Sequence, residues 1–337
     1  MKTLFDKSKI GNLKVKNRLF RSATWEKLAS EDGRLNTEIY AIYEELAKGG
    51  VGTIVTGLTD VSKNNIALAG NMRLYEDFLI EDYKRLTDIV HRYDCNILTE
   101  INMDKYVAEN DSEVLQIKDI NDLTKRDIEN IIDLFAQSSL RAMKAGFDGV
   151  QIHLAYGWLL NRFVNPLLNQ RKDEYGGSCK NRLRIITEMI TAIRSIKKDF
   201  HISVKFSFFD NDKGEFAITE CVNICKLLSL SKIDSLEILG GHSPKEKGTQ
   251  YEACYLELAL AVKSVIDTPI ILTGNNHDID NMKNLLNNDG IEYFGMSRPL
   301  IREPDLPNRW LEGCRKKSIC ISCNGCYTTY GNRCVFS

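Results

Sequence analysis

The sequence lacks the features that mark several large classes of protein. Its 45 lysines and arginines nearly balance its 46 aspartates and glutamates, so no basic excess favours nucleic acid and nothing in the charge balance favours a membrane surface. No run approaches the roughly 18 apolar residues that span a bilayer, and residues 1–19 lack the apolar core of a signal peptide. We therefore expect a soluble cytoplasmic protein whose partners include neither nucleic acid nor a membrane.

The loops that bind nucleotides in common folds are missing as well. No G-x-G-x-x-G follows a strand-like run, which argues against a Rossmann domain, and the absence of a P-loop argues against nucleotide hydrolysis. Ten cysteines occur in a chain with no export signal, and they therefore indicate free thiols or metal ligands rather than disulfides.

The sequence does contain a regular alternation of strand-like and helix-like segments. Amphipathic patterns, such as those over 37–50 and 124–146, separate strand-like runs that are too far apart for simple hairpins, so the runs should pair in parallel. A doubly wound sheet also fits. The count of eight runs and the chain length favour a (β/α)8 TIM barrel over residues 1–313, followed by a Cys-rich tail over 314–337. The runs span residues 19–24, 52–57, 96–101, 149–154, 202–207, 235–240, 269–274 and 291–296.

A barrel of this kind places its functional residues at the carboxyl ends of the strands. After the seventh and eighth runs, TGNN and GMSRPL would set backbone N–H groups and one arginine, Arg298, where barrels commonly hold a phosphate. We therefore expect a phosphorylated cofactor. The small and polar residues at the strand ends are Ser22, Thr24, Thr56, Gly57, Glu100, Asn102, His153, Tyr156, Lys205, Gly240, Gly241, Gly274, Asn275, Ser297 and Arg298.

Four longer segments resemble a known family. They are IGNLKVKNRLFRSAT at 10–24, GVGTIVTG at 50–57, the segment 146–184 with its NP, DEYGGS and NR elements, and GMSRPLIREPDLPNRW at 295–310. Together they are similar to the Old Yellow Enzyme family of NADH:flavin oxidoreductases. The resemblance implies a single barrel that binds FMN non-covalently and takes electrons from NADH or NADPH. Hydride would then pass from the reduced flavin to the activated C=C bond of an enone-type small molecule.

The resemblance also implies roles for individual residues. His153 matches the histidine that hydrogen-bonds the substrate carbonyl and polarises it for hydride transfer. Lys205 would stabilise the anionic reduced flavin. The residues lining the flavin would be Ser22, Ala23, Thr24, Gly57, Glu100 and Lys205, and those holding its phosphate would be Gly274, Asn275, Ser297 and Arg298.

Three positions of the site depart from the family pattern. The second substrate-binding position is Tyr156, and the position of the usual proton-donating tyrosine is Trp158, whose indole cannot act as an acid or base. Tyr156 then becomes either the replacement proton donor or a second ligand of the carbonyl, with water supplying the proton. Glu100 stands where most members have glutamine. Its carboxylate would lower the flavin potential unless Lys205 pairs with it.

The tail carries a separate motif. Cys320, Cys323, Cys326 and Cys334 form C-x2-C-x2-C-x7-C, a spacing in which thiolates can converge on a cluster or metal. The run CISCNGC resembles the 4Fe-4S loop of the iron-sulfur members of the family, trimethylamine dehydrogenase and 2,4-dienoyl-CoA reductase, although the gap to the fourth cysteine is shorter. A structural zinc, or no metal, stays open. A cluster would need an external electron-transfer protein.

Two other interpretations of the sequence stay open. In one, the flavin serves another substrate class, an amine, a quinone or a nitro compound, for which no tyrosine donor is required. In the other, the barrel has lost its flavin and is a non-catalytic binding protein, against which the phosphate-site residues Gly274 and Arg298 argue. The sequence also leaves open whether the chain forms a homo-oligomer.

Overall fold

Most of the chain is described by the computed structural model. Gly241, one of the predicted strand-end residues, lies outside the described part. Within that part, no helix combines the length and the apolar character needed to cross a membrane. The described residues are 1–64, 68–109, 115–207, 214–240 and 251–336.

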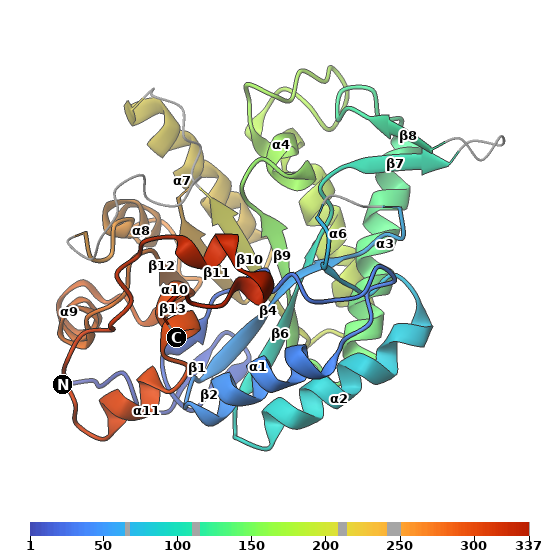
Figure 1. The fold of residues 1–337 in the computed structure, drawn as a ribbon. Coiled ribbons are helices and arrows are strands. Elements are labelled where there is room, and N and C mark those ends of the chain that lie inside the picture. Colours follow the sequence, from blue (N-terminus) through green and yellow to red (C-terminus); the bar gives the residue numbers. More distant parts are fainter. Residues whose placement is uncertain (65–67, 110–114, 208–213, 241–250, 337) are drawn as a thin grey trace.

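Eight parallel strands form a closed barrel at the centre of the molecule (Figure 1), and each falls on one of the eight predicted runs. In chain order they are β3 (Leu19–Arg21), β4 (Thr53–Asp60), β6 (Asn96–Asn102), β9 (Gly149–Leu154), β10 (His201–Ser207), β11 (Ser235–Leu239), β12 (Ile270–Thr273) and β13 (Tyr293–Met296). Strand β3 pairs with both β4 and β13, which closes the ring. The predicted (β/α)8 fold is therefore confirmed.

Helices cover the outside of the barrel (Figure 1). The two helices predicted as examples begin at capping residues. Helix α1 (Thr37–Lys48) follows Asn36, and α3 (Lys125–Lys144) begins with a capping box formed by Thr124 before the helix and Asp127 in its first turn. The other helices are α2 (Ile80–His91), α4 (Leu159–Val164), α5 (Cys179–Arg182), α6 (Arg184–Ile196), α7 (Gly214–Leu230), α8 (Leu256–Lys263), α9 (Ile279–Asn284), α10 (Arg298–Arg302) and α11 (Leu306–Leu311). Short helical turns are η1 (Asp77–Leu79), η2 (Leu285–Asp289), η3 (Gly325–Thr328) and η4 (Tyr330–Asn332).

An antiparallel hairpin closes the N-terminal end of the barrel. It consists of β1 (Ser8–Ile10) and β2 (Leu13–Val15), and Asn12 in its turn lies 2.8 Å from Nδ1 of His201 at the start of β10. Ile10 and Val15 belong to an apolar cluster with Phe20, Ile271 and Tyr293. The remaining strands are β5 (Met72–Arg73), which extends the sheet beside β4, and the projecting hairpin of β7 (Tyr106–Glu109) and β8 (Leu115–Lys118).

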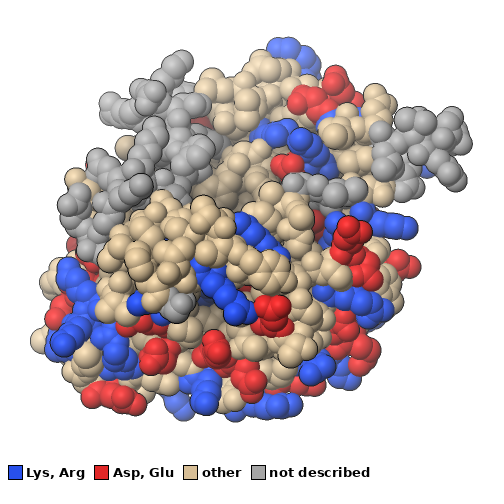
Figure 2. All heavy atoms as spheres, in the orientation of Figure 1, with Lys and Arg blue, Asp and Glu red and all other residues tan. Residues whose placement is uncertain are grey.

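The Cys-rich tail lies across the opposite, C-terminal end of the barrel (Figure 1). The Ser318 N–H donates to the carbonyl oxygen of His277 over 2.9 Å, and Oγ of Ser322 lies 3.0 Å from Nε2 of the same histidine. The tail carries four exposed cationic side chains, Arg315, Lys316, Lys317 and Arg333, and Figure 2 shows uncharged surface with Lys and Arg beside it near the centre of the view. The exposed apolar side chains of the tail are Ile319, Ile321, Tyr327, Tyr330, Val335 and Phe336.

Candidate active site

A cavity of about 390 Å³ lies where the barrel fold predicts a site, at the carboxyl ends of the strands. An adjoining pocket of about 80 Å³ shares part of its lining and also contains Gly274 and Asn275. Twelve predicted site residues therefore come together around one space, although they derive from the carboxyl ends of six different strands. The predicted residues that line the larger cavity are Ser22, Ala23, Thr24, Glu100, His153, Tyr156, Trp158, Lys205, Ser297 and Arg298.

Gly57 lies behind the cavity wall, and its neighbour Leu58 faces the cavity instead. A Cβ atom at position 57 would come within 2.2 Å of Oε2 of Glu26 and within 2.5 Å of the carbonyl oxygen of Thr24. Glycine is therefore the residue that lets β4 pass this close to the loop after β3.

A buried ionic cluster occupies one wall of the cavity. Nζ of Lys205 lies 3.1 Å from Oε2 of Glu100, and Nδ1 of His153 lies 3.3 Å from Oε1. Burial raises the pKa of Glu100, but its neighbours Lys205 and His153 outweigh burial and the pKa lies below its ordinary value. Glu100 is therefore a carboxylate. Its ion pair with Lys205 is the pairing that would offset the effect of this carboxylate on the flavin potential.

A second buried carboxylate, Glu237 on β11, supports this cluster. It accepts hydrogen bonds from Oγ of Ser22, from Nε2 of Gln151 over 2.9 Å and from Oγ1 of Thr273 over 2.8 Å. Burial lowers the pKa of Lys205, but Glu100 and Glu237 outweigh burial and hold that pKa above its ordinary value. Glu237 was not among the predicted site residues, although it is the lone acidic residue in the apolar run 235–240.

Two aromatic side chains stand over His153. The ring of Trp158 meets the imidazole edge to face, with centroids 5.3 Å apart, and the Tyr156 ring lies 5.8 Å away. Tyr156 has a left-handed backbone (φ 59°), and its N–H donates to Oγ of Ser207 over 2.9 Å. Desolvation raises the pKa of the Tyr156 hydroxyl to about 12, against the opposing effect of Lys205. At neutral pH this hydroxyl is a hydrogen-bond donor but a weak acid.

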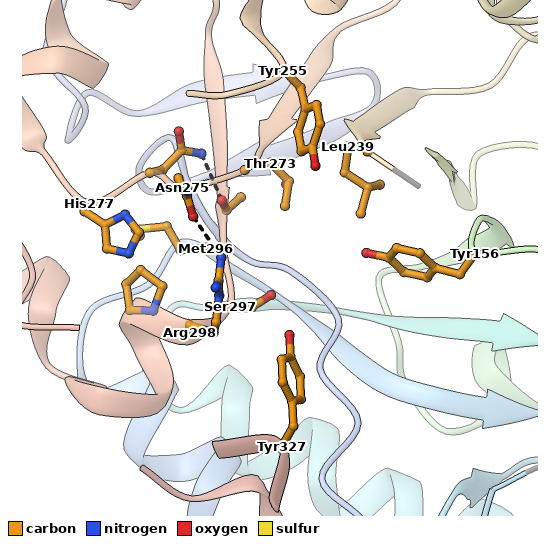
Figure 3. Close-up of a pocket in the computed structure, with 15 residues that line it drawn as sticks. Tyr156, Leu239, Tyr255, Thr273, Asn275, His277, Met296, Ser297, Arg298 and Tyr327 are labelled. Carbon is orange, nitrogen blue, oxygen red and sulfur yellow. Dashed lines mark hydrogen bonds between the residues drawn. The ribbon is translucent and has the colours of Figure 1, made fainter. Parts of the chain in front are cut away.

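Arg298 lies at the far end of the cavity and is held from two sides, and Figure 3 shows the side that faces Asn275. Its Nη2 donates to Oδ1 of Asn275 over 2.8 Å, and its Nη1 donates to Oδ1 of Asn324 in the tail over 2.7 Å. Figure 3 also shows the hydroxyl groups of Tyr255 and Tyr327 directed toward this pocket. A fixed guanidinium at the mouth of a polar pocket is the donor that a phosphate group requires.

The turn after β12 adds further donors to this end of the site. Gly274 (φ 148°) and Asn275 (φ 52°) both have positive φ, a conformation in which successive backbone N–H groups can form an anion-binding concavity. Nδ2 of the buried Asn275 has no hydrogen-bond partner among the described residues. These groups fit the phosphate of FMN, and the ionic cluster at the other end of the cavity fits its polar ring.

The four tail cysteines lie around one small cavity of about 20 Å³ beside Arg298. The N–H of Gly325 donates to Sγ of Cys323 over 3.4 Å. Across the described residues, however, no three His, Cys, Asp or Glu side chains are gathered closely enough to hold a metal ion. The thiols match a metal site in number and type, but the structure does not bring them to a common centre.

Comparison with known proteins identifies related chains. The sequence profile of the NADH:flavin oxidoreductase / NADH oxidase family matches residues 3–317. An NADH oxidase of Thermoanaerobacter brockii is 30% identical over 349 residues, which cover 96% of this chain and 53% of the relative. An NADPH dehydrogenase of Clostridium acetobutylicum is 29% identical over 314 residues, covering 89% and 92% of the two chains. The chain thus spans about half the length of the first of these relatives.

Solved structures share the fold. A 2-naphthoyl-CoA reductase complex superposes with a TM-score of 0.86 at 23% identity, covering 98% of this chain and 56% of that one. An old yellow enzyme homologue from Zymomonas mobilis superposes with a TM-score of 0.75 at 22% identity, covering 94% and 95% of the two chains. At these identities the likeness establishes a common barrel and leaves the reaction to be inferred from the site.

Proposed function

The chain belongs to the NADH:flavin oxidoreductase / NADH oxidase family, and from that premise we propose that it is an FMN-dependent, NAD(P)H-driven reductase of an activated C=C bond. The observation that carries the proposal is the buried His153 beside Glu100. Both ring nitrogens of His153 lack a hydrogen-bond partner among the described residues, while Nδ1 lies next to the carboxylate. An Nδ1–H that faces Glu100 would fix the ring, and a second proton on Nε2 would then be free to donate to a substrate oxygen.

FMN, when bound, supplies the hydride. The phosphate-site residues Gly274, Asn275, Ser297 and Arg298 would hold its anionic end. Ser22, Ala23 and Thr24 would line its ring, as would Gly57 through its backbone. Lys205 would place its charge near the electron-rich edge of the ring, and Glu100 moderates that charge because the two groups are 3.1 Å apart.

The substrate would bind between His153 and the two aromatic side chains. His153 would donate a hydrogen bond to its carbonyl oxygen and so stabilise the negative charge that develops there during hydride transfer. Tyr156 would be the second donor to that oxygen, a role that suits its high pKa better than proton donation does. Trp158 would form a wall of the pocket because its indole has no proton to give at neutral pH.

The test combines spectroscopy with separated half-reactions. The anaerobic visible spectrum should show bound flavin, and NAD(P)H should drive reduction of a simple cyclic enone. His153→Ala should slow enone reduction by about 100-fold or more and leave flavin reduction by the nicotinamide unchanged. His91→Ala, at a surface histidine 39% exposed in its side chain, is the matched control. Flavin-loaded wild type that reduces no enone would overturn the proposal.

A second candidate keeps the flavin and changes the substrate to an amine, a quinone or a nitro compound. The presence of Trp158 favours it, because such substrates do not need an acid at that position. Screening the same three classes with the flavin-loaded protein separates the candidates. A non-catalytic barrel is disfavoured by Lys205 and Glu100, since a buried ion pair is costly to retain without a use.

The tail cysteines Cys320, Cys323, Cys326 and Cys334 are a further part of the proposal. They would bind a 4Fe-4S cluster, or zinc as the alternative, after the thiols close around the small cavity that they line. A cluster would imply an electron-transfer protein as partner. Iron, zinc and acid-labile sulfide assays on anaerobically purified protein decide among the cluster, zinc and free thiols.

A further inference from the structure

Glu26 is a buried carboxyl group with no part in the site described above. It lies in the loop after β3, is 5% exposed, and packs its Oε2 against the backbone of Gly57. Tyr43 of α1 hydrogen-bonds to it, and the Tyr43 hydroxyl also accepts the N–H of Gly57 over 2.8 Å. Glu26 therefore lies directly behind the wall of the cavity of about 390 Å³ described above, which we call the reaction cavity.

A second cavity, of about 310 Å³, lies on the other side of Glu26. It is enclosed by α1, α10 and the tail, and its lining extends outward to Glu45 and Arg333, which are exposed at the surface. This cavity gives Glu26 a route to solvent. The ionisable groups that face Glu26 or line this cavity are Arg21 of β3, Glu38, Tyr43 and Glu45 of α1, Glu100 of β6, Arg302 of α10, and Arg333 and Cys334 of the tail.

The two cavities share a thin wall. Thr24, Ile301 and Asn332 line both of them. Nδ2 of the buried Asn332 donates to the carbonyl oxygen of Trp25, whereas its Oδ1 has no hydrogen-bond partner among the described residues. Two of the three wall residues thus offer polar atoms that a water molecule could bridge.

Reduction of a C=C bond consumes one proton for each hydride. The hydride brings two electrons to one carbon, and the other carbon must take up a proton. Position 158 holds a tryptophan, which cannot act as an acid, and the raised pKa makes the Tyr156 hydroxyl a poorer acid than an ordinary tyrosine. A carboxyl group with access to the cavity would be a stronger proton source.

We propose that Glu26 is the proton reservoir of the reaction cavity. This role rests on the proposed reductase function. The carboxylic acid of Glu26 releases a proton through water at the wall formed by Thr24 and Asn332, and the substrate carbon takes that proton up. Glu26 is left as a carboxylate and regains a proton from solvent through the second cavity. No further oxidant or reductant is needed.

The electrostatics suit a reservoir. Burial raises the pKa of Glu26 to about 7, while Arg21 opposes the rise and Glu100 adds to it. A group with its pKa near the working pH can both give up and regain a proton during turnover.

The test compares Glu26→Gln with Glu45→Gln, an exposed carboxyl of the same cavity. In the wild type, kcat for enone reduction should fall as pH rises through about 7, because the acid form is lost. Glu26→Gln should lose that limb and lower the rate of the oxidative half-reaction by about tenfold or more, with flavin reduction unchanged. Glu45→Gln should match the wild type. A Glu26→Gln enzyme with the wild-type rate and pH profile overturns the inference.

An infrared titration of the resting protein adds a readout that does not depend on turnover. The stretch of a protonated carboxyl should disappear with a midpoint near pH 7 in the wild type and be absent from Glu26→Gln. Glu26→Leu, which also removes the carboxyl, replaces Glu26→Gln if the latter fails to fold, and a wild-type profile from it counts against the inference. A wild-type protein that reduces no enone overturns the proposed function itself. An active wild type whose rate and pH profile are unchanged by substitution of Glu26 overturns this inference alone.

Discussion

The two ends of the barrel are built on opposite principles. The N-terminal end is plugged by the β1–β2 hairpin, whose Ile10 and Val15 pack into an apolar cluster. The C-terminal end buries charge, with Lys205 between Glu100 and Glu237. An apolar plug stabilises the fold through burial alone, whereas buried ions contribute little net stability and are costly when one partner is lost. The residues that stabilise the fold by apolar burial and the residues proposed to carry the chemistry therefore lie at different ends of the barrel.

The largest effect is expected from Lys205→Met. Removing the ammonium group leaves Glu100 and Glu237 buried together without their cation, which should lower the free energy of unfolding by about 3–5 kcal/mol and abolish flavin retention. Urea unfolding of the single variant and of Lys205→Met/Glu100→Gln measures this. The double variant should recover much of the stability, and equal losses in both would remove the charge argument.

A change at the other end should separate stability from activity. Ile10→Ala deletes a fully buried side chain from the apolar plug and should cost about 3 kcal/mol of unfolding free energy, with kcat unchanged below the unfolding transition. Lys9→Ala, at an exposed position on the same strand, is the control. A fall in kcat for folded Ile10→Ala would show that the two ends are coupled.

Glu26 should make the stability of the C-terminal end depend on pH. Its pKa is 4.5 in the unfolded chain and about 7 in the folded protein, so the folded state binds the proton more tightly. Stability relative to Glu26→Gln is therefore highest below pH 4.5 and falls as pH rises toward 7, by at most roughly 3 kcal/mol. Thermal or urea unfolding across this window measures the difference. A difference that does not vary with pH would contradict the raised pKa.

Arg298→Ala should weaken FMN binding by about 2 kcal/mol, or roughly thirtyfold in Kd, through loss of a charged donor to the phosphate. Equilibrium dialysis of FMN reports the effect. Arg302→Ala, on the same short helix α10, is the matched control. Unchanged retention in Arg298→Ala would remove the phosphate site from this end of the cavity.

The smallest effect is expected from Tyr156→Phe. Loss of one hydrogen bond to the substrate carbonyl should reduce transition-state stabilisation by about 1 kcal/mol and so lower kcat/KM roughly fivefold. The pH profile should not change. A collapse of several hundredfold would instead identify Tyr156 as the proton donor and would place it in the proton route now assigned to Glu26.

The barrel could be predicted from the sequence because its strands are buried on both sides and therefore appear as continuous apolar runs. All eight runs became strands, and their ends brought Glu100, His153 and Lys205 to one wall. The hairpins β1–β2 and β7–β8 were not predicted, because strands of three or four residues are too short to show a period of two.

Contacts between segments far apart in the chain could not be predicted. The pairing of Glu237 with Ser22, Gln151 and Thr273 depends on which strand residues point into the closed barrel, and that is fixed by the stagger of the strands rather than by any local pattern. The burial of Glu26 behind Gly57 likewise follows from the path of a loop. Glu237 and Glu26 were not among the predicted site residues because their partners lie in other strands, helices and loops.

The position of Arg298 has a practical consequence for any attempt to divide this chain. The chain becomes rich in cysteine after residue 314, which makes this position an obvious place to truncate the chain or to join it to another protein. Yet the Arg298 guanidinium donates hydrogen bonds both to Asn275 of the barrel and to Asn324 of the tail. Tyr327 of the tail also lines the same cavity. A chain shortened at 313 would lose Asn324, one of the two side chains that hold Arg298, so a fragment made to bind FMN should include the tail.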